Sequence, residues 1–189
     1  MFPMVVELRG RCVMVIGAGA VGAYKAAQLV EAGARVTILA SEVRAALDPG
    51  VEAVLRRPYQ FGDLAGAFLV VAATGDPLVN DRIVVEAREL HILLNVVDDL
   101  ARSNFFFTAV HRDGDVVVSI STSGASPALA QWLRNTLAQA VPKNIAHVAT
   151  QLRAERRALH ARGASTEQLD WTARVQHLID AGLEAPDEG

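Results

Sequence analysis

The sequence CVMVIGAGAVG, residues 12–22, decides the fold of this chain. It begins with an apolar run, as in a buried strand, and ends with Gly17, Gly19 and Gly22 in the spacing Gly-x-Gly-x-x-Gly. Apolar residues at helical spacing then continue over 23–32. A strand, a glycine turn and a helix in this order form a fingerprint of dinucleotide binding.

The glycine turn predicts how a dinucleotide is held. Gly17 makes the tight turn, and Gly19 lets the backbone approach a pyrophosphate. The N-terminus of the following helix offers free N–H groups and partial positive charge to that anion. The alternative is a glycine-rich turn that only packs the helix on the strand and binds nothing.

A second signal lies beyond the next apolar run, residues 35–39, where Glu42 follows Gly22 by 20 residues. We expect Glu42 or Ser41 to hydrogen-bond the adenosine ribose, and an acid at this place favours NAD over NADP. Arg44 acts against this preference, because an arginine nearby can accept a 2′-phosphate.

The first hundred residues continue to alternate between strands and helices. Apolar runs predict strands over residues 12–16, 35–39, 51–55, 68–73 and 92–97, and helical spacing predicts helices over 23–32 and 78–89. Because the strands are apolar throughout, we expect a Rossmann-type α/β domain with a parallel sheet covered on both faces. Thr74 and Asp98 each follow a strand, so we expect them at the edge where ligands bind.

The pattern changes after Asp98. Two β-rich runs, 105–110 and 115–121, flank Asp113-Gly114, which is a hairpin signal. Helices are predicted over 127–140 and 144–161. We therefore expect an NAD-binding Rossmann domain (residues 1–102), a β-hairpin dimerisation segment (103–142) and a small helical C-terminal domain (143–189).

The hairpin also predicts a homodimer. Its runs Phe105-Phe106-Phe107 and Val116-Val117-Val118 have no obvious place in a parallel sheet. Apolar residues on both faces need covering, and a second chain is the natural cover.

Composition excludes several other classes of protein. The chain has 189 residues, 51% of them hydrophobic, and a net charge of −3, which argues against general nucleic-acid binding. The longest apolar run, residues 68–74, is too short to span a membrane, and the N-terminus does not resemble a secretory signal, so we expect a cytoplasmic protein. The single cysteine, Cys12, and five scattered histidines offer no metal-ligand spacing, so we expect no resident metal.

Two polar segments carry the predicted chemistry. Asp98 can act as a general base at the ligand-binding edge, and the alternative is an ordinary turn or N-cap aspartate. Residues 119–127 form a hydroxyl-rich turn into a helix, which can present N–H and O–H donors to a substrate carboxylate. The alternative for this turn is plain helix capping by Ser126.

These segments together resemble one family. The matching motifs are Leu8-Arg9-Gly10-Arg11, the glycine turn, Lys25, Glu31-Ala32-Gly33-Ala34, Ala72-Ala73-Thr74 with Asn80, Asn95-Val96-Val97-Asp98, residues 121–127, and Leu129, Leu133 and Arg134. In this order they resemble the N-terminal module of siroheme synthases, the precorrin-2 dehydrogenase/sirohydrochlorin ferrochelatase family, over about residues 5–140.

The resemblance implies NAD-dependent oxidation of the tetrapyrrole precorrin-2 to sirohydrochlorin, and in some members ferrous iron insertion to give sirohaem. It also implies two interlocked chains, with Asp98 as the catalytic base. The implied cofactor-binding residues are Gly17, Gly19, Ala20, Val21, Ser41, Glu42 and Thr74, and the implied substrate-binding residues are Asn95, Ser121, Thr122, Ser123 and Gly124. The chain departs from the family pattern at Ala18, Tyr24, Thr108 and Ala125.

Two other functions compete with this enzyme. A non-catalytic NAD-sensing module keeps the fold but needs neither Asp98 nor the turn at residues 121–127, so these segments favour the enzyme. A dehydrogenase for another small substrate lacks a lysine or histidine in an obvious acid–base position. The sequence leaves open whether iron is inserted and whether the product serves sirohaem, cobalamin or haem synthesis.

Overall fold

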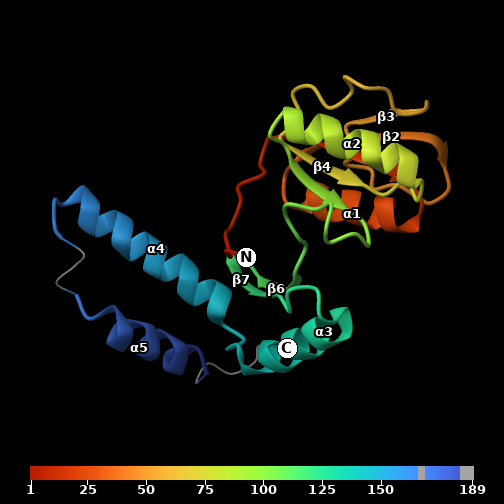
Figure 1. Ribbon diagram of the computed structural model, residues 1–189. Helices are drawn as coiled ribbons and strands as arrows, with labels where there is room; N and C mark the ends of the chain where they lie inside the picture. The colour runs from red at the N-terminus through yellow and green to blue at the C-terminus, as the bar shows by residue number, and fades with distance from the viewer. Residues whose placement is uncertain (166–168, 184–189) are drawn as a thin grey trace. The chain divides into compact units, whose positions relative to one another are not determined.

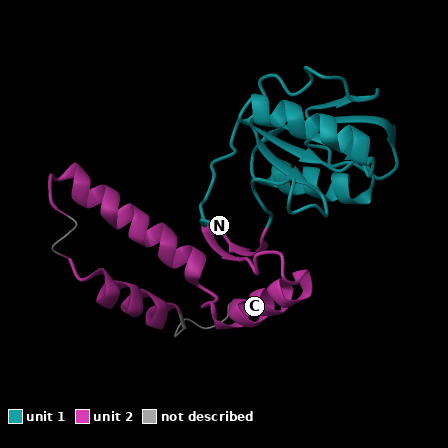
Figure 2. Ribbon diagram, in the orientation of Figure 1, with its two compact units in different colours: residues 1–107 teal, residues 108–189 magenta. Residues whose placement is uncertain are grey.

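A computed structural model describes residues 1–165 and 169–183. The chain forms two compact units, residues 1–107 and 108–189, which Figure 2 colours separately. Each unit is described by itself below. The division into three parts that the sequence predicts stays a prediction.

The first unit is a five-stranded parallel sheet in the order β3-β2-β1-β4-β5 (Figure 1). Its strands are β1 (Cys12–Ala18), β2 (Arg35–Val43), β3 (Ala53–Leu55), β4 (Leu69–Ala72) and β5 (Leu93–Val96), and its helices are α1 (Ala20–Glu31) and α2 (Pro77–Glu89). This arrangement confirms the predicted Rossmann-type α/β fold. The carboxyl ends of β1, β4 and β5 lie next to one another at one edge of the sheet.

Alternation along the strands explains why both faces of the sheet are buried. On β4, Val70 packs in one apolar cluster with Ile83 of α2, whereas Val71 packs in a second cluster with Leu29 of α1. Successive side chains of a strand point to opposite faces, so each helix covers one face. The continuous apolar runs in the sequence reflect this double burial.

A buried carboxylate fixes the loop before β4. Glu86 of α2 is 1% exposed and accepts hydrogen bonds from the Tyr59 hydroxyl and from the Leu64 backbone N–H, the latter at 2.9 Å. Burial, followed by the hydrogen bond to Glu86, raises the pKa of Tyr59 well above its usual range. The pair therefore holds residues 57–66 against α2 without an unpaired buried charge.

The second unit contains the predicted hairpin, whose strands are β6 (Ala109–Asp113) and β7 (Val116–Ile120). The prediction that its first strand begins at Phe105 is wrong. Phe105 and Phe107 belong to the first unit, where they pack against its second apolar cluster. The phenylalanine run is therefore part of the covering of the parallel sheet.

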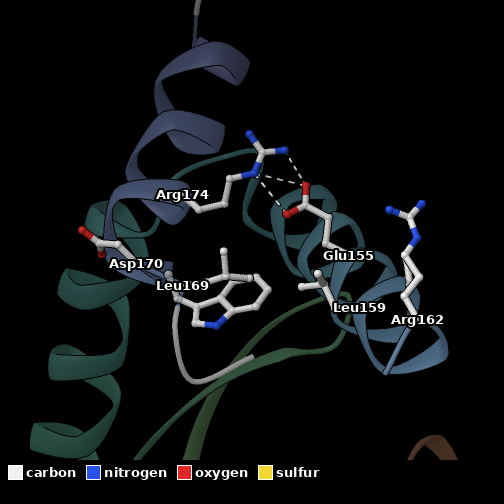
Figure 3. A pocket seen from close by; sticks show the side chains of 8 residues that line it. Glu155, Leu159, Arg162, Leu169, Asp170 and Arg174 are labelled. Carbon is white, nitrogen blue, oxygen red and sulfur yellow. Dashed lines mark hydrogen bonds and ion pairs between the residues drawn. The ribbon is translucent and has the colours of Figure 1, made fainter. Parts of the chain in front are cut away.

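Three helices complete the second unit: α3 (Pro127–Ala140), α4 (Ile145–Ala161) and α5 (Trp171–Leu183). Asn144, just before α4, donates hydrogen bonds to the carbonyls of Leu178 and Ile179 near the end of α5. Arg174 of α5 donates to both carboxylate oxygens of Glu155 on α4, as Figure 3 shows, and this guanidinium lowers the pKa of Glu155. The two helices thus pack as a pair.

Within the described residues, no helix combines the length and the apolar character that a membrane span requires.

Candidate active site

The backbone at the end of β1 requires glycine at two of its three glycine positions. Gly17 has a φ of +107°, and a Cβ added there would lie 2.2 Å from the carbonyl oxygen of Ala73. A Cβ at Gly22 would lie 2.1 Å from the carbonyl oxygen of Gly17. These two glycines therefore let β1, α1 and the end of β4 approach closely.

Gly19 is different, because a Cβ added there would meet no atom within 4 Å. It precedes α1 in extended conformation, and no side chain caps the helix end. The N–H groups of Ala20 and Val21 in the first turn of α1 therefore lie at the positive end of the helix beside open space. Such a cradle suits a pyrophosphate, so the residues present fit a bound dinucleotide.

The predicted ribose-binding residues lie in a bulge of β2. The pairing of β1 with β2 runs from Ile16↔Leu39 directly to Ala18↔Val43, so Ser41 and Glu42 are pushed out opposite Gly17. Both are exposed. The structure thus brings them next to the glycine turn, at the place the sequence predicts.

Glu42 has a partner already. The guanidinium of Arg44 lies 2.7 Å from its carboxylate, and both side chains are largely exposed. An exposed pair of this kind contributes about 0–1 kcal/mol, so a ribose hydroxyl can compete with it.

Thr74 comes directly after the residue that contacts Gly17. Its hydroxyl donates to Asn80 Oδ1 at 2.7 Å and accepts from the backbone N–H of Asp76 at 3.0 Å. Asp76 caps α2 by accepting from Leu78 N. The side chain of Thr74 therefore fixes the turn at the carboxyl end of β4, beside the glycine cradle.

Asp98 follows β5 at the same edge of the sheet. The N–H of Val97 donates to the carbonyl of Ala72 at 2.9 Å, so the chain runs beside β4 up to Asp98. Asp98 has a φ of +59°, in the left-handed region, which aspartate adopts more often than most residues other than glycine. Its carboxylate is exposed and makes no hydrogen bond or ion pair with any residue that the structure describes. An exposed carboxylate without a partner at this edge of the sheet is available to a ligand bound there.

Asp99, in contrast, stabilises the turn that follows Asp98. Its carboxylate accepts from the backbone N–H of Arg102 at 3.0 Å and lies 3.3 Å from the Arg102 guanidinium. This closes the turn after Asp98 and fixes the backbone on which Asp98 stands.

Two positioning residues, Ser103 and Asn104, were missed from the sequence. The hydroxyl of Ser103 accepts from Val96 N at 2.9 Å, and the side chain of Asn104 accepts from Leu94 N at 2.7 Å. They satisfy the free edge of β5, and nothing in the local sequence indicates this role, because it depends on the chain folding back along that strand.

The predicted substrate residue Asn95 lies in β5 and is half-buried, and its amide donates to the carbonyl of Phe105 at 3.1 Å. Nearby along this segment, the Nζ of Lys25 lies 3.8 Å from the centroid of the Phe107 ring. Burial lowers the pKa of Lys25. The side chains of Asn95 and Lys25 therefore attach the phenylalanine segment to the rest of the first unit.

The other predicted substrate residues form a tight turn in the second unit. The N–H of Ala125 donates to the carbonyl of Thr122 at 2.9 Å, and both central residues, Ser123 and Gly124, have positive φ. Two positive φ values are typical of a type I′ turn. The hydroxyl of Ser121 accepts from the N–H of Ser123 at 3.2 Å, which leaves Ser123 and Gly124 exposed at the tip.

Within the described part of the chain, no three His, Cys, Asp or Glu residues come together in a way that could hold a metal ion.

Comparison with known proteins gives two family matches. Residues 4–109 match a family described as putative NAD(P)-binding, and residues 113–140 match the central part of a sirohaem biosynthesis protein. With the cradle at Gly19, the first match identifies NAD(P) as the cofactor, and the acid at Glu42 favours NAD.

Among curated proteins, the chain is 38% identical to a siroheme synthase of Photorhabdus laumondii over 78% of this chain and 32% of that protein. It is 37% identical to a siroheme synthase of Ectopseudomonas mendocina, again over 78% of this chain and 32% of that protein. The chain thus spans about a third of the length of the curated relatives it matches.

Among solved structures, the fold is similar to that of a protein titled SirC, precorrin-2 dehydrogenase. The TM-score is 0.70 at 24% identity, over 96% of this chain and 88% of the other. The likeness extends over both compact units and supports the fold. The family matches at residues 4–109 and 113–140, together with 38% identity to a siroheme synthase over 78% of this chain, show that the chain belongs to the family of the siroheme synthase N-terminal module.

Proposed function

We propose that the chain oxidises precorrin-2 to sirohydrochlorin with NAD as the hydride acceptor. The observation that carries this proposal is Asp98, an unengaged carboxylate on a left-handed backbone at the same sheet edge as the glycine cradle. Family membership supports the choice of substrate, since the curated relatives are named siroheme synthases. An NAD sensor would not need this carboxylate.

Different residues of the chain bind the cofactor and accept the proton. The cradle at Gly19, with the N–H groups of Ala20 and Val21, holds the pyrophosphate, and Ser41 and Glu42 hold the ribose. NAD, when bound, supplies the hydride acceptor. Asp98 accepts the proton that the tetrapyrrole loses as its hydride leaves, so the oxidation yields sirohydrochlorin, NADH and one proton released to solvent.

In the first unit, we propose Asn95 as a substrate-binding residue. In the second unit, we propose the same role for the turn formed by Ser121, Thr122, Ser123 and Gly124. The exposed tip of that turn, Ser123 and Gly124, presents backbone N–H groups and a hydroxyl to the substrate carboxylates. The hydroxyl of Thr122 donates a hydrogen bond to the carbonyl oxygen of Ser126 at 3.1 Å, so Thr122 stabilises the turn. We further propose that ferrous iron is a substrate, with Asp98 accepting N–H protons of the macrocycle as iron enters.

We also propose a homodimer through residues 103–142. The second unit exposes apolar side chains on one face of the hairpin and on α3. Those at least 38% exposed are Val110, Val117, Leu129, Trp132 and Leu137. A second copy of the chain is the natural cover for such a set. We also propose that the protein is cytoplasmic, because the cytoplasm supplies the NAD that this reaction needs.

The test is an absorbance time course with precorrin-2 and NAD, with and without ferrous iron. We expect NADH and sirohydrochlorin to appear together, and sirohaem to follow when iron is present. NAD binding in calorimetry without any oxidation of precorrin-2 would point to the sensor instead. Oxidation without metallation would remove the iron step alone.

A further inference from the structure

Two faces of helix α4 have different surroundings. Toward α5 the helix carries Glu155, Ala158, Leu159 and Arg162, which line a pocket of about 390 Å³ that Leu169, Asp170, Trp171 and Arg174 close from the other side (Figure 3). A second face borders an open space of about 450 Å³ on the surface of the helix. Its residues all come from α4 and are Ala149, Leu152, Arg153, Arg156, Arg157 and His160. Their spacing of three and four places them on one side of the helix.

The charge on this second face is unusual for a chain with a net charge of −3. Arg153 is partly neutralised, because its Nη1 lies 2.5 Å from a carboxylate oxygen of Asp115. Arg156 and Arg157 are exposed, and they make no hydrogen bond or ion pair with any residue that the structure describes. Two adjacent guanidinium groups thus stay charged and available, since arginine does not lose its proton in proteins.

The face is also partly apolar. Ala149 and Leu152 are half-buried one turn before Arg156 and Arg157, so this face combines apolar side chains with cations one turn further along the helix. Guanidinium groups bind carboxylates through paired hydrogen bonds and stack on flat rings. This chemistry fits a flat apolar ligand that carries carboxylates at its rim.

We infer that this face of α4 docks the acetate and propionate side chains of a tetrapyrrole. The inference rests on the proposed function, because a precorrin substrate is a polycarboxylate of this kind. Charge complementarity selects the occupant: the unpaired arginines meet the substrate's carboxylates, and the apolar side chains of this face meet its ring. Arg156 and Arg157 are the residues on which docking depends.

The experiment measures binding of uroporphyrin, a stable tetrapyrrole with acetate and propionate side chains, to the 189-residue chain by fluorescence titration. The variant is Arg156→Ala with Arg157→Ala. The matched control is Arg88→Ala, an exposed helical arginine of α2 in the other unit. Two exposed charge pairs are worth about 0.4–2 kcal/mol, so the double variant should raise the Kd by about 2- to 30-fold. The control should leave the Kd unchanged.

Raising the salt concentration should weaken binding to the unaltered chain more than binding to the double variant, because screening acts on the exposed charges. Equal Kd values for the double variant and the control would overturn the inference, as would a DNA oligonucleotide that binds this face where uroporphyrin does not. The proposed function is tested separately, by oxidation of precorrin-2 in the unaltered chain. Oxidation with unchanged uroporphyrin affinity in the double variant would leave that function standing and remove the docking face.

Discussion

Two single variants, Gly17→Ala and Gly19→Ala, should distinguish an effect on stability from an effect on NAD binding. Gly17→Ala places a Cβ at 2.2 Å from the carbonyl oxygen of Ala73, on a backbone with a φ of +107°. Gly19→Ala places the same group where no atom lies within 4 Å, on a φ of −80° that any residue adopts. The two variants are therefore matched in chemistry and opposite in their surroundings.

The expected magnitudes follow from these contacts. For Gly17→Ala, the positive φ costs about 1–2 kcal/mol and the overlap with a backbone atom about 1–3 kcal/mol, a large part of a typical total stability of about 5–15 kcal/mol. For Gly19→Ala, stability should change by less than about 1 kcal/mol. Its methyl group fills the cradle, however, and loss of one hydrogen bond to a charged phosphate should raise the Kd for NAD about 10- to 150-fold.

Urea denaturation measures the first quantity, and calorimetric titration with NAD measures the second. Gly17→Ala should lose stability, whereas Gly19→Ala should keep its stability and lose affinity for NAD. The reasoning about the cradle is refuted if Gly19→Ala binds NAD as tightly as the unaltered chain does.

Three further changes test separate parts of the account. Glu42→Ala should weaken NAD binding and free Arg44, so the affinity for NADP relative to NAD should rise in calorimetry; an unchanged ratio would exclude both from cofactor choice. Glu86→Gln should lower the free energy of unfolding by about 1–3 kcal/mol in urea, because an amide cannot serve both buried donors as well as a carboxylate does, and an unchanged value would contradict the buried network. If the proposed dimer forms through residues 103–142, Trp132→Glu should give a monomer in light scattering, whereas Leu90→Glu, at an exposed apolar site of the first unit, should not. A dimer in both variants would contradict this interface.

The fold of the first unit could be predicted from sequence because its signals are local. A strand buried on both faces must be apolar throughout, and a turn that tolerates no Cβ must contain glycine, so β1 and Gly17 are both visible in the sequence. The phenylalanine run was predicted wrongly because its β-rich composition is the same whether it forms a strand or covers a sheet. Only the tertiary contacts of Phe105 and Phe107 decide between the two.

The positions of Thr74 and Asp98 could be predicted for the same reason. Both residues follow parallel strands, and the carboxyl ends of parallel strands share one edge of the sheet; their role in binding stays a proposal. The left-handed backbone of Asp98 and the bonds from Ser103 that support it depend on a chain segment folding back along β5, which no local pattern encodes. The bulge that exposes Glu42 likewise appears only in the pairing of β1 with β2.

The most direct test of the account is the turnover of Asp98→Asn with precorrin-2 and NAD, measured beside Asp99→Asn. Asparagine tolerates the left-handed backbone and keeps the shape of the side chain, but it accepts no proton, so turnover should fall by about 10²–10⁴-fold while the Kd for NAD stays the same. Asp99→Asn should be much milder, because its side chain faces Arg102 and an amide oxygen can still accept that hydrogen bond. Near-normal oxidation by Asp98→Asn would contradict the account.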